Sequence, residues 1–183
     1  MARGFQLVSL LRFLRPQLLL PLIGNSWLMV CLAFTLEAED YRNPQLIAMG
    51  LPVSLMLAAM VTCGMCIYAL ATNDLLDIRR NHASTLQETA GRSRAMSTPV
   101  AAVLSIVSLA MAVIACVQLG RESTGLAIAA ALGILFYNLA GRHMPAVRIV
   151  TLGLLAALNM MIVSPQMGYA WPVWLSMSHV MIV

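Results

Sequence analysis

Long apolar segments are the feature that most constrains how this chain can fold. A helix that crosses a bilayer needs roughly 20 apolar residues at about 1.5 Å each. Five segments approach or exceed that length, at about 17–36, 45–72, 99–119, 124–140 and 145–163. A sixth, at about 169–183, is too short to cross. We therefore expect an all-α polytopic transmembrane bundle, with five full spans plus an incomplete sixth helix, in a single membrane domain over residues 1–183.

Composition supports the same class of protein. Of the 183 residues, 61% are apolar and 10% are charged, whereas about a quarter are charged in an ordinary soluble domain. The basic residues are all arginines and lie between the apolar segments, so they form no continuous basic face and a nucleic-acid partner is not expected. The cysteines lie inside apolar segments, and we read Cys63-Gly-Met-Cys66 as helix packing and not as a metal or redox site. The expected partner is the lipid bilayer.

The positions of the arginines predict an orientation. The N-terminal segment and the connections at 73–98 and 141–148 contain most of them, namely Arg3, Arg12, Arg15, Arg79, Arg80, Arg92, Arg94, Arg142 and Arg148. The alternate connections contain only Arg42 and Arg121. Because arginine-rich loops stay in the cytoplasm, we expect an integral membrane protein, of the cytoplasmic membrane if bacterial, with its N-terminus and residues 73–98 in the cytoplasm.

One connection is rich in chemically useful side chains. It begins directly after the second apolar segment with Asn73, Asp74 and Asp77. If the helix continues past the membrane, the spacings i,i+4 and i,i+3 allow these oxygens to share one face. Mg²⁺ is typically held by one or two carboxylates together with water and substrate phosphates. Spacing alone leaves a second interpretation equally open, in which these residues are the ordinary polar end of a helix.

A resemblance favours the first interpretation. Asn73-Asp-x-x-Asp77 after a second helix, with Arg15-Pro16 at the first helix and Phe136-Tyr-Asn-Leu-Ala-Gly-Arg142 at the end of the fourth, resembles the UbiA-type intramembrane prenyltransferases. The likeness covers most of the chain, which resembles the N-terminal two-thirds of such an enzyme. It implies transfer of an isoprenyl group from a diphosphate to a hydrophobic acceptor, with Mg²⁺ as cofactor.

The resemblance also implies roles for individual residues. Asn73, Asp74 and Asp77 would hold the metal, and Arg92, Arg94 and Arg142 would bind the diphosphate. Asn25, a polar residue in the middle of the first apolar segment, would line the acceptor cavity. An alternative for Asn25 is a hydrogen bond between helices, because polar side chains commonly join membrane spans.

The sequence also departs from the family pattern. Asn81 stands where a third aspartate is expected, and no acidic residue follows Glu122, so the family's second aspartate-rich motif is absent from these residues. Two interpretations follow. The chain is a prenyltransferase that is incomplete as given, or it is a non-catalytic, degenerate UbiA-like helical subunit that packs with other membrane subunits in a larger complex.

Overall fold

The computed structural model describes residues 16–36, 43–83, 97–167 and 170–182, with the backbone alone at 16–18, 79–83 and 142. Within these ranges every regular element is helical. In chain order the elements are α2 (Pro16–Thr35), α3 (Pro44–Met49), α4 (Leu51–Ala83), α5 (Thr98–Leu119), α6 (Arg121–Leu139), η2 (Gly141–His143), α7 (Pro145–Met161), η3 (Pro165–Met167) and α8 (Trp171–Ile182). The predicted all-α class is confirmed for the described part of the chain.

The second apolar segment, predicted as a span at 45–72, is not one continuous helix: it contains one candidate span at Leu51–Ile78, preceded by the short helix α3. The helix breaks at Gly50, whose φ of +78° and ψ of 157° suit glycine far better than any other residue. The hydroxyl of Ser54 lies 2.8 Å from the carbonyl oxygen of Leu46 and 2.9 Å from that of Gly50, and its single hydrogen can serve one of them at a time. The N–H of Gly50 donates to the carbonyl of Ile47, so the Ser54 hydroxyl supplies the donor that the break removes from the Leu46 carbonyl and links α3 to α4.

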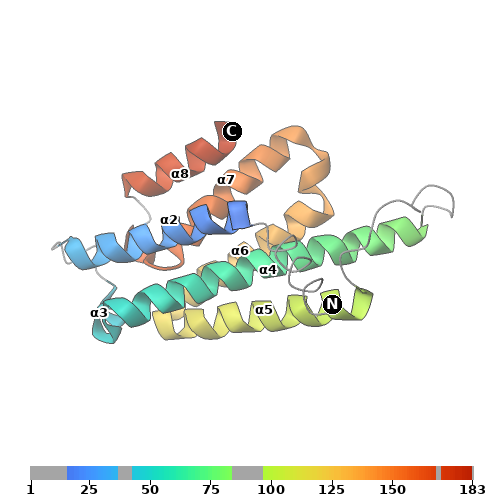
Figure 1. Ribbon diagram of the computed structural model, residues 1–183. Coiled ribbons are helices and arrows are strands. Elements are labelled where there is room, and N and C mark those ends of the chain that lie inside the picture. The colour runs from blue at the N-terminus through green and yellow to red at the C-terminus, as the bar shows by residue number, and fades with distance from the viewer. Residues whose placement is uncertain (1–15, 37–42, 84–96, 168–169, 183) are drawn as a thin grey trace.

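Helix α4 is the centre of the bundle. It packs against α5 along its length and also contacts α2 and α6, while α7 packs against α8, α6 and α2. Successive long helices run in opposite directions, so the C-terminal part of α4, the start of α5 and η2 all lie at one end of the molecule (Figure 1). The start of α3, the α5–α6 turn and the start of α8 lie at the other end (Figure 1).

Small residues allow the helices to approach closely. The buried core includes Ala58, Ala112, Ala127 and Ala157, each from a different helix. At Gly64 in α4, an added Cβ would lie 2.7 Å from the carbonyl oxygen of Ser108 in α5. Lipid tails are as apolar as the side chains of these helices, so no hydrophobic driving force brings helices together in a membrane. They associate through close packing of this kind instead.

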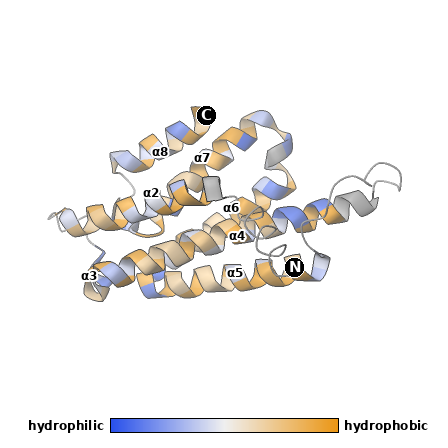
Figure 2. Cartoon of the chain, viewed as in Figure 1, coloured by the Kyte–Doolittle hydropathy of each residue, from blue (hydrophilic) through white to orange (hydrophobic). Residues whose placement is uncertain are grey.

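The outward faces are apolar, as expected of a protein in lipid. Figure 2 shows hydrophobic residues along α4 and α5 and more hydrophilic residues toward the helix ends. Ile106 and Ile114 of α5 and Leu132 of α6 are all more than 60% exposed. Contiguous apolar surface of this kind is rare on soluble monomers, so the molecule has the surface of a membrane protein.

Three described helices are long and apolar enough to cross a bilayer: Leu51–Ile78 within α4, Thr98–Leu119 and Arg121–Leu139. Two further apolar stretches, Leu19–Thr35 and Pro145–Met161, are shorter. At about 1.5 Å per residue, the 17 residues of α7 extend about 26 Å, slightly less than the hydrocarbon thickness of about 30 Å. Three candidate spans are therefore present, and the five-span arrangement and its orientation stay predictions.

Candidate functional site

The Asn-Asp-x-x-Asp motif lies on α4, which continues to Ala83 without interruption. The side-chain amide of Asn73 donates to Oδ2 of Asp77 at 3.3 Å. Both side chains are half-buried. The expectation that the helix persists and places these two residues on one face is therefore confirmed. The contact also holds the Asp77 carboxylate toward the preceding turn of α4.

Asp74 lies on the same helical turn as Asn73 and is also half-buried. In an α-helix, residues three apart are surface neighbours, so Asp74 and Asp77 bring two carboxylates close to one amide. No group of three His, Cys, Asp or Glu side chains suited to a metal ion occurs in the described ranges. The motif therefore offers two carboxylates and one amide from a single helix, which do not form a complete metal site by themselves.

A hydrogen-bonded link between α6 and α4 lies one turn before the motif. The amide of Asn138 is buried, and it donates to the backbone carbonyl of Ala69 at 3.0 Å and to the hydroxyl of Thr72 at 3.2 Å. Thr72 in turn donates to the carbonyl of Tyr68. Because Thr72 directly precedes Asn73, this link holds the end of α6 against the turn of α4 from which the motif emerges.

Asn25 lies away from the motif. Its amide donates to the hydroxyl of Ser176 in α8 at 3.0 Å, which is the hydrogen bond between helices that the sequence left as the alternative. The neighbouring Ser26 contacts Thr62 of α4 at 3.1 Å. Thr62 and Asn73 are eleven positions apart on one helix, or about 16 Å along its axis. Asn25 therefore lies well within the bundle, at the level of Thr62.

A second set of polar contacts, which the sequence reasoning missed, crosses the bundle at this level. The hydroxyl of Thr62 lies 3.1 Å from both Ser26 Oγ and Asn159 Oδ1, and its single hydrogen can serve one of them at a time. The amide of Asn159 donates to the carbonyl of Leu22 at 3.1 Å. The contacts join α2, α4 and α7. The signal available was the presence of isolated Ser, Thr and Asn residues inside apolar segments.

Three arginines are predicted to bind the diphosphate. Arg92 and Arg94 lie outside the described residues. Arg142 lies in η2, at the same end of the molecule as the C-terminal part of α4 (Figure 1), but its side chain is outside the description. Cys63 and Cys66 are half-buried free thiols on α4.

Comparison with known proteins gives no relative for this chain. No protein-family model matches it, and neither curated proteins nor solved structures give a significant match. The resemblance to the UbiA-type prenyltransferases therefore rests on the residues named above. What stands without it is that, in the part of the chain that the structure describes, every regular element is helical and three helices are long and apolar enough to cross a membrane.

Proposed function

We propose that the C-terminal part of α4 binds the diphosphate group of an isoprenyl diphosphate together with Mg²⁺, as part of a UbiA-type prenyl-transfer site. The observation that supports this most is the pairing of Asn73 with Asp77 at 3.3 Å, next to Asp74 and at the end of a candidate membrane span. A carboxylate near a membrane boundary is costly unless it is hydrated, paired or bound to a cation. Two of them, three positions apart on one helix, concentrate negative charge at this end of α4, which suits a cationic ligand.

Each residue has a defined part in this proposal. Asp74 and Asp77 supply carboxylate oxygens, and Asn73 orients the Asp77 carboxylate through its amide. Mg²⁺, when bound, would neutralise charge on the departing diphosphate. The candidates for contact with the diphosphate oxygens are Arg92, Arg94 and Arg142, since guanidinium groups bind phosphate with paired hydrogen bonds. The apolar bundle surface next to α4 suits an isoprenyl chain.

A second candidate function is that of a non-catalytic helical subunit in a larger membrane complex. It is favoured by the wide apolar surface of α8, where Trp171, Leu175 and Ile182 are 71%, 57% and 84% exposed. It is also favoured by the motif's two carboxylates, fewer than a complete metal–diphosphate site is expected to have. This function requires no Mg²⁺-dependent ligand, so ligand binding separates the two candidates.

The experiment is a binding titration of the purified chain in lipid nanodiscs with farnesyl diphosphate, in the presence of Mg²⁺ or of EDTA. We expect saturable binding that requires Mg²⁺ and that weakens at least tenfold in Asp77→Asn, equivalent to about 1.4 kcal/mol. Asn73→Ala is expected to weaken it by a smaller factor, because the residue orients a ligand. Gln118→Ala, an exposed amide at the opposite end of the bundle, is the matched control and should bind normally. Binding that is absent, or unaffected by both Asp77→Asn and EDTA, would favour the subunit function.

A further inference from the structure

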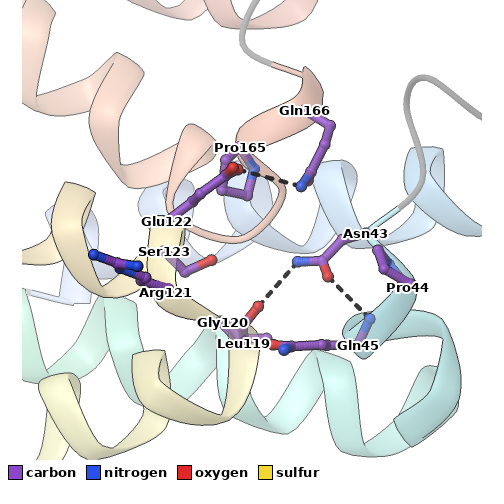
Figure 3. A pocket seen from close by; sticks show the side chains of 10 residues that line it. All are labelled: Asn43, Pro44, Gln45, Leu119, Gly120, Arg121, Glu122, Ser123, Pro165 and Gln166. Carbon is purple, nitrogen blue, oxygen red and sulfur yellow. Dashed lines mark hydrogen bonds between the residues drawn. The ribbon is translucent and has the colours of Figure 1, made fainter.

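A pocket of about 220 Å³ with several polar residues in its walls lies at the end of the bundle opposite the Asn73–Asp77 motif. Three connections meet there: the start of α3, the α5–α6 turn and η3 (Figure 3). A single buried water needs roughly 10–15 Å³, so the pocket is large enough for a small molecular group. Because two candidate membrane spans meet at Leu119 and Arg121, the pocket lies where the apolar part of the bundle ends.

The walls of the pocket are held by specific contacts. The side chain of Asn43 is buried; its oxygen accepts from the backbone N–H of Gln45, and its amide donates to the carbonyl of Leu119, both at 3.1 Å. Gly120 has a φ of +123°, and a Cβ there would lie 2.6 Å from Oε1 of Gln45. The α5–α6 turn and the start of α3 therefore fit together closely, with glycine required at the contact.

Two buried polar atoms of the pocket have no hydrogen-bond partner among the described residues. They are Oγ of Ser123, whose residue is 1% exposed, and Oε1 of Gln166. Figure 3 shows the Ser123 hydroxyl directed into the space between the α5–α6 turn and η3. A buried polar group left without a partner costs about 1–3 kcal/mol. Both atoms therefore call for a partner that enters the pocket.

A carboxylate also lines the pocket. Glu122 accepts a hydrogen bond from Nε2 of Gln166 at 3.4 Å, near the long limit for such a contact. The pocket thus presents three kinds of acceptor oxygen, from a carboxylate, an amide and a hydroxyl. A primary ammonium group has three N–H donors and no acceptor, so it matches this set and gains a charge-assisted bond to Glu122.

The pocket is also lined by a positively charged residue. Arg121 lines the same pocket and extends away from Glu122 (Figure 3). It lies in the first turn of α6, where the helix dipole favours a negative group. From this turn, the exposed apolar side chains of Ile128 and Leu132 continue along α6. A phospholipid headgroup could therefore place its ammonium at the acceptor oxygens and its phosphate at Arg121. Its acyl chains would then lie on the apolar surface of α6.

From this arrangement we propose that the pocket binds the headgroup of an ethanolamine phospholipid, with the ammonium at Glu122, Gln166 and Ser123 and the phosphate at Arg121. The lipid, and not a soluble amine, is the occupant because the pocket lies at the end of two candidate spans and the exposed apolar side chains of Ile128 and Leu132 follow on α6. The site is independent of the one proposed at Asp77.

The test is competitive lipid retention. The purified full chain is exchanged into an equimolar mixture of phosphatidylethanolamine, phosphatidylcholine and phosphatidylglycerol, and the lipids kept after detergent washing are measured by native mass spectrometry. Phosphatidylcholine carries a quaternary ammonium without N–H donors, and phosphatidylglycerol carries no cation. We expect phosphatidylethanolamine to be enriched over both, and the enrichment to fall about tenfold in Glu122→Gln, the loss expected of one charge-assisted hydrogen bond.

Further variants keep the result interpretable. Ser123→Ala and Gln166→Ala, from different elements, should each reduce the enrichment. Thr124→Ala is the matched control, because its hydroxyl already donates to the carbonyl of Gly120 at 2.9 Å, and it should leave the enrichment unchanged. Equal retention of the three lipids, a preference for phosphatidylglycerol, or enrichment that survives both Glu122→Gln and Gln166→Ala would overturn the proposal. If the chain binds soluble phosphoethanolamine but does not enrich phosphatidylethanolamine, the assignment of the occupant to a lipid is overturned.

Discussion

Replacing Gly64 with alanine tests the packing of α4 on α5, which holds the centre of the bundle together. The added Cβ would lie 2.7 Å from the carbonyl oxygen of Ser108, 2.9 Å from Cβ of Ala112 and 3.2 Å from its backbone nitrogen. Two of these three atoms belong to the backbone of α5, so relief requires the helices to separate. Overpacking of this kind typically costs about 1–3 kcal/mol.

Gly125→Ala in α6 is the matched control, because a Cβ there would meet no atom within 4 Å. Both substitutions gain the same helix propensity, about 1 kcal/mol, so the difference between them isolates the packing cost. We expect Gly64→Ala to have a free energy of unfolding about 1–3 kcal/mol below that of Gly125→Ala. The measurement is SDS-induced unfolding in mixed micelles, followed by far-UV circular dichroism. Equal stability of the two variants would refute the close approach of α4 and α5 at Gly64.

Four further predictions concern other parts of the molecule. Thr62→Val should lower stability by about 1 kcal/mol in the same unfolding assay, since one hydrogen bond between membrane helices contributes about 0.6 and at most about 1.7 kcal/mol; an unchanged midpoint would show that the contact with Asn159 contributes nothing. Gly50→Ala should cost about 1–3 kcal/mol through backbone strain alone, because a Cβ there meets nothing within 4 Å, and a more stable variant would contradict the break between α3 and α4. A cysteine introduced at position 40 of a cysteine-free chain should react with an impermeant reagent outside intact cells while one at position 85 does not, and the reverse pattern would invert the orientation. The 183-residue chain alone should show no prenyl transfer with Mg²⁺ and common isoprenyl diphosphates, since removing one stabilising donor already costs about 10²–10³ in rate; diphosphate release abolished by Asp77→Ala would contradict this.

Much of the fold follows from the lengths of the apolar segments. The helices observed at Pro16–Thr35, Thr98–Leu119 and Pro145–Met161 begin and end within two residues of the predicted bounds. The break at Gly50 could not be predicted in this way, since apolar residues continue on both sides of it. It depends on a backbone conformation and on the Ser54 contact, and neither changes the hydropathy pattern.

In the candidate sites, contacts within one helix could be predicted from the sequence, whereas contacts between separate elements could not. The pairing of Asn73 with Asp77 could be predicted because i,i+4 neighbours on one helix always lie close together. The contact of Asn25 with Ser176 joins residues 151 positions apart, so its partner depends on how the helices pack. The pocket at Glu122 was missed for the same reason, since its walls come from three separate connections.

The central claim, that the end of α4 binds a divalent cation together with diphosphate, can be tested most directly with Mn²⁺ in place of Mg²⁺. Electron paramagnetic resonance measures free Mn²⁺ in the presence of inorganic diphosphate and the chain in nanodiscs, relative to empty nanodiscs with the same diphosphate. We predict that the wild-type chain lowers the free Mn²⁺ signal only when diphosphate is present, and that Asp77→Asn abolishes most of this decrease while Gln118→Ala does not. A wild-type signal equal to that of empty nanodiscs, or an equal decrease in Asp77→Asn, would contradict it.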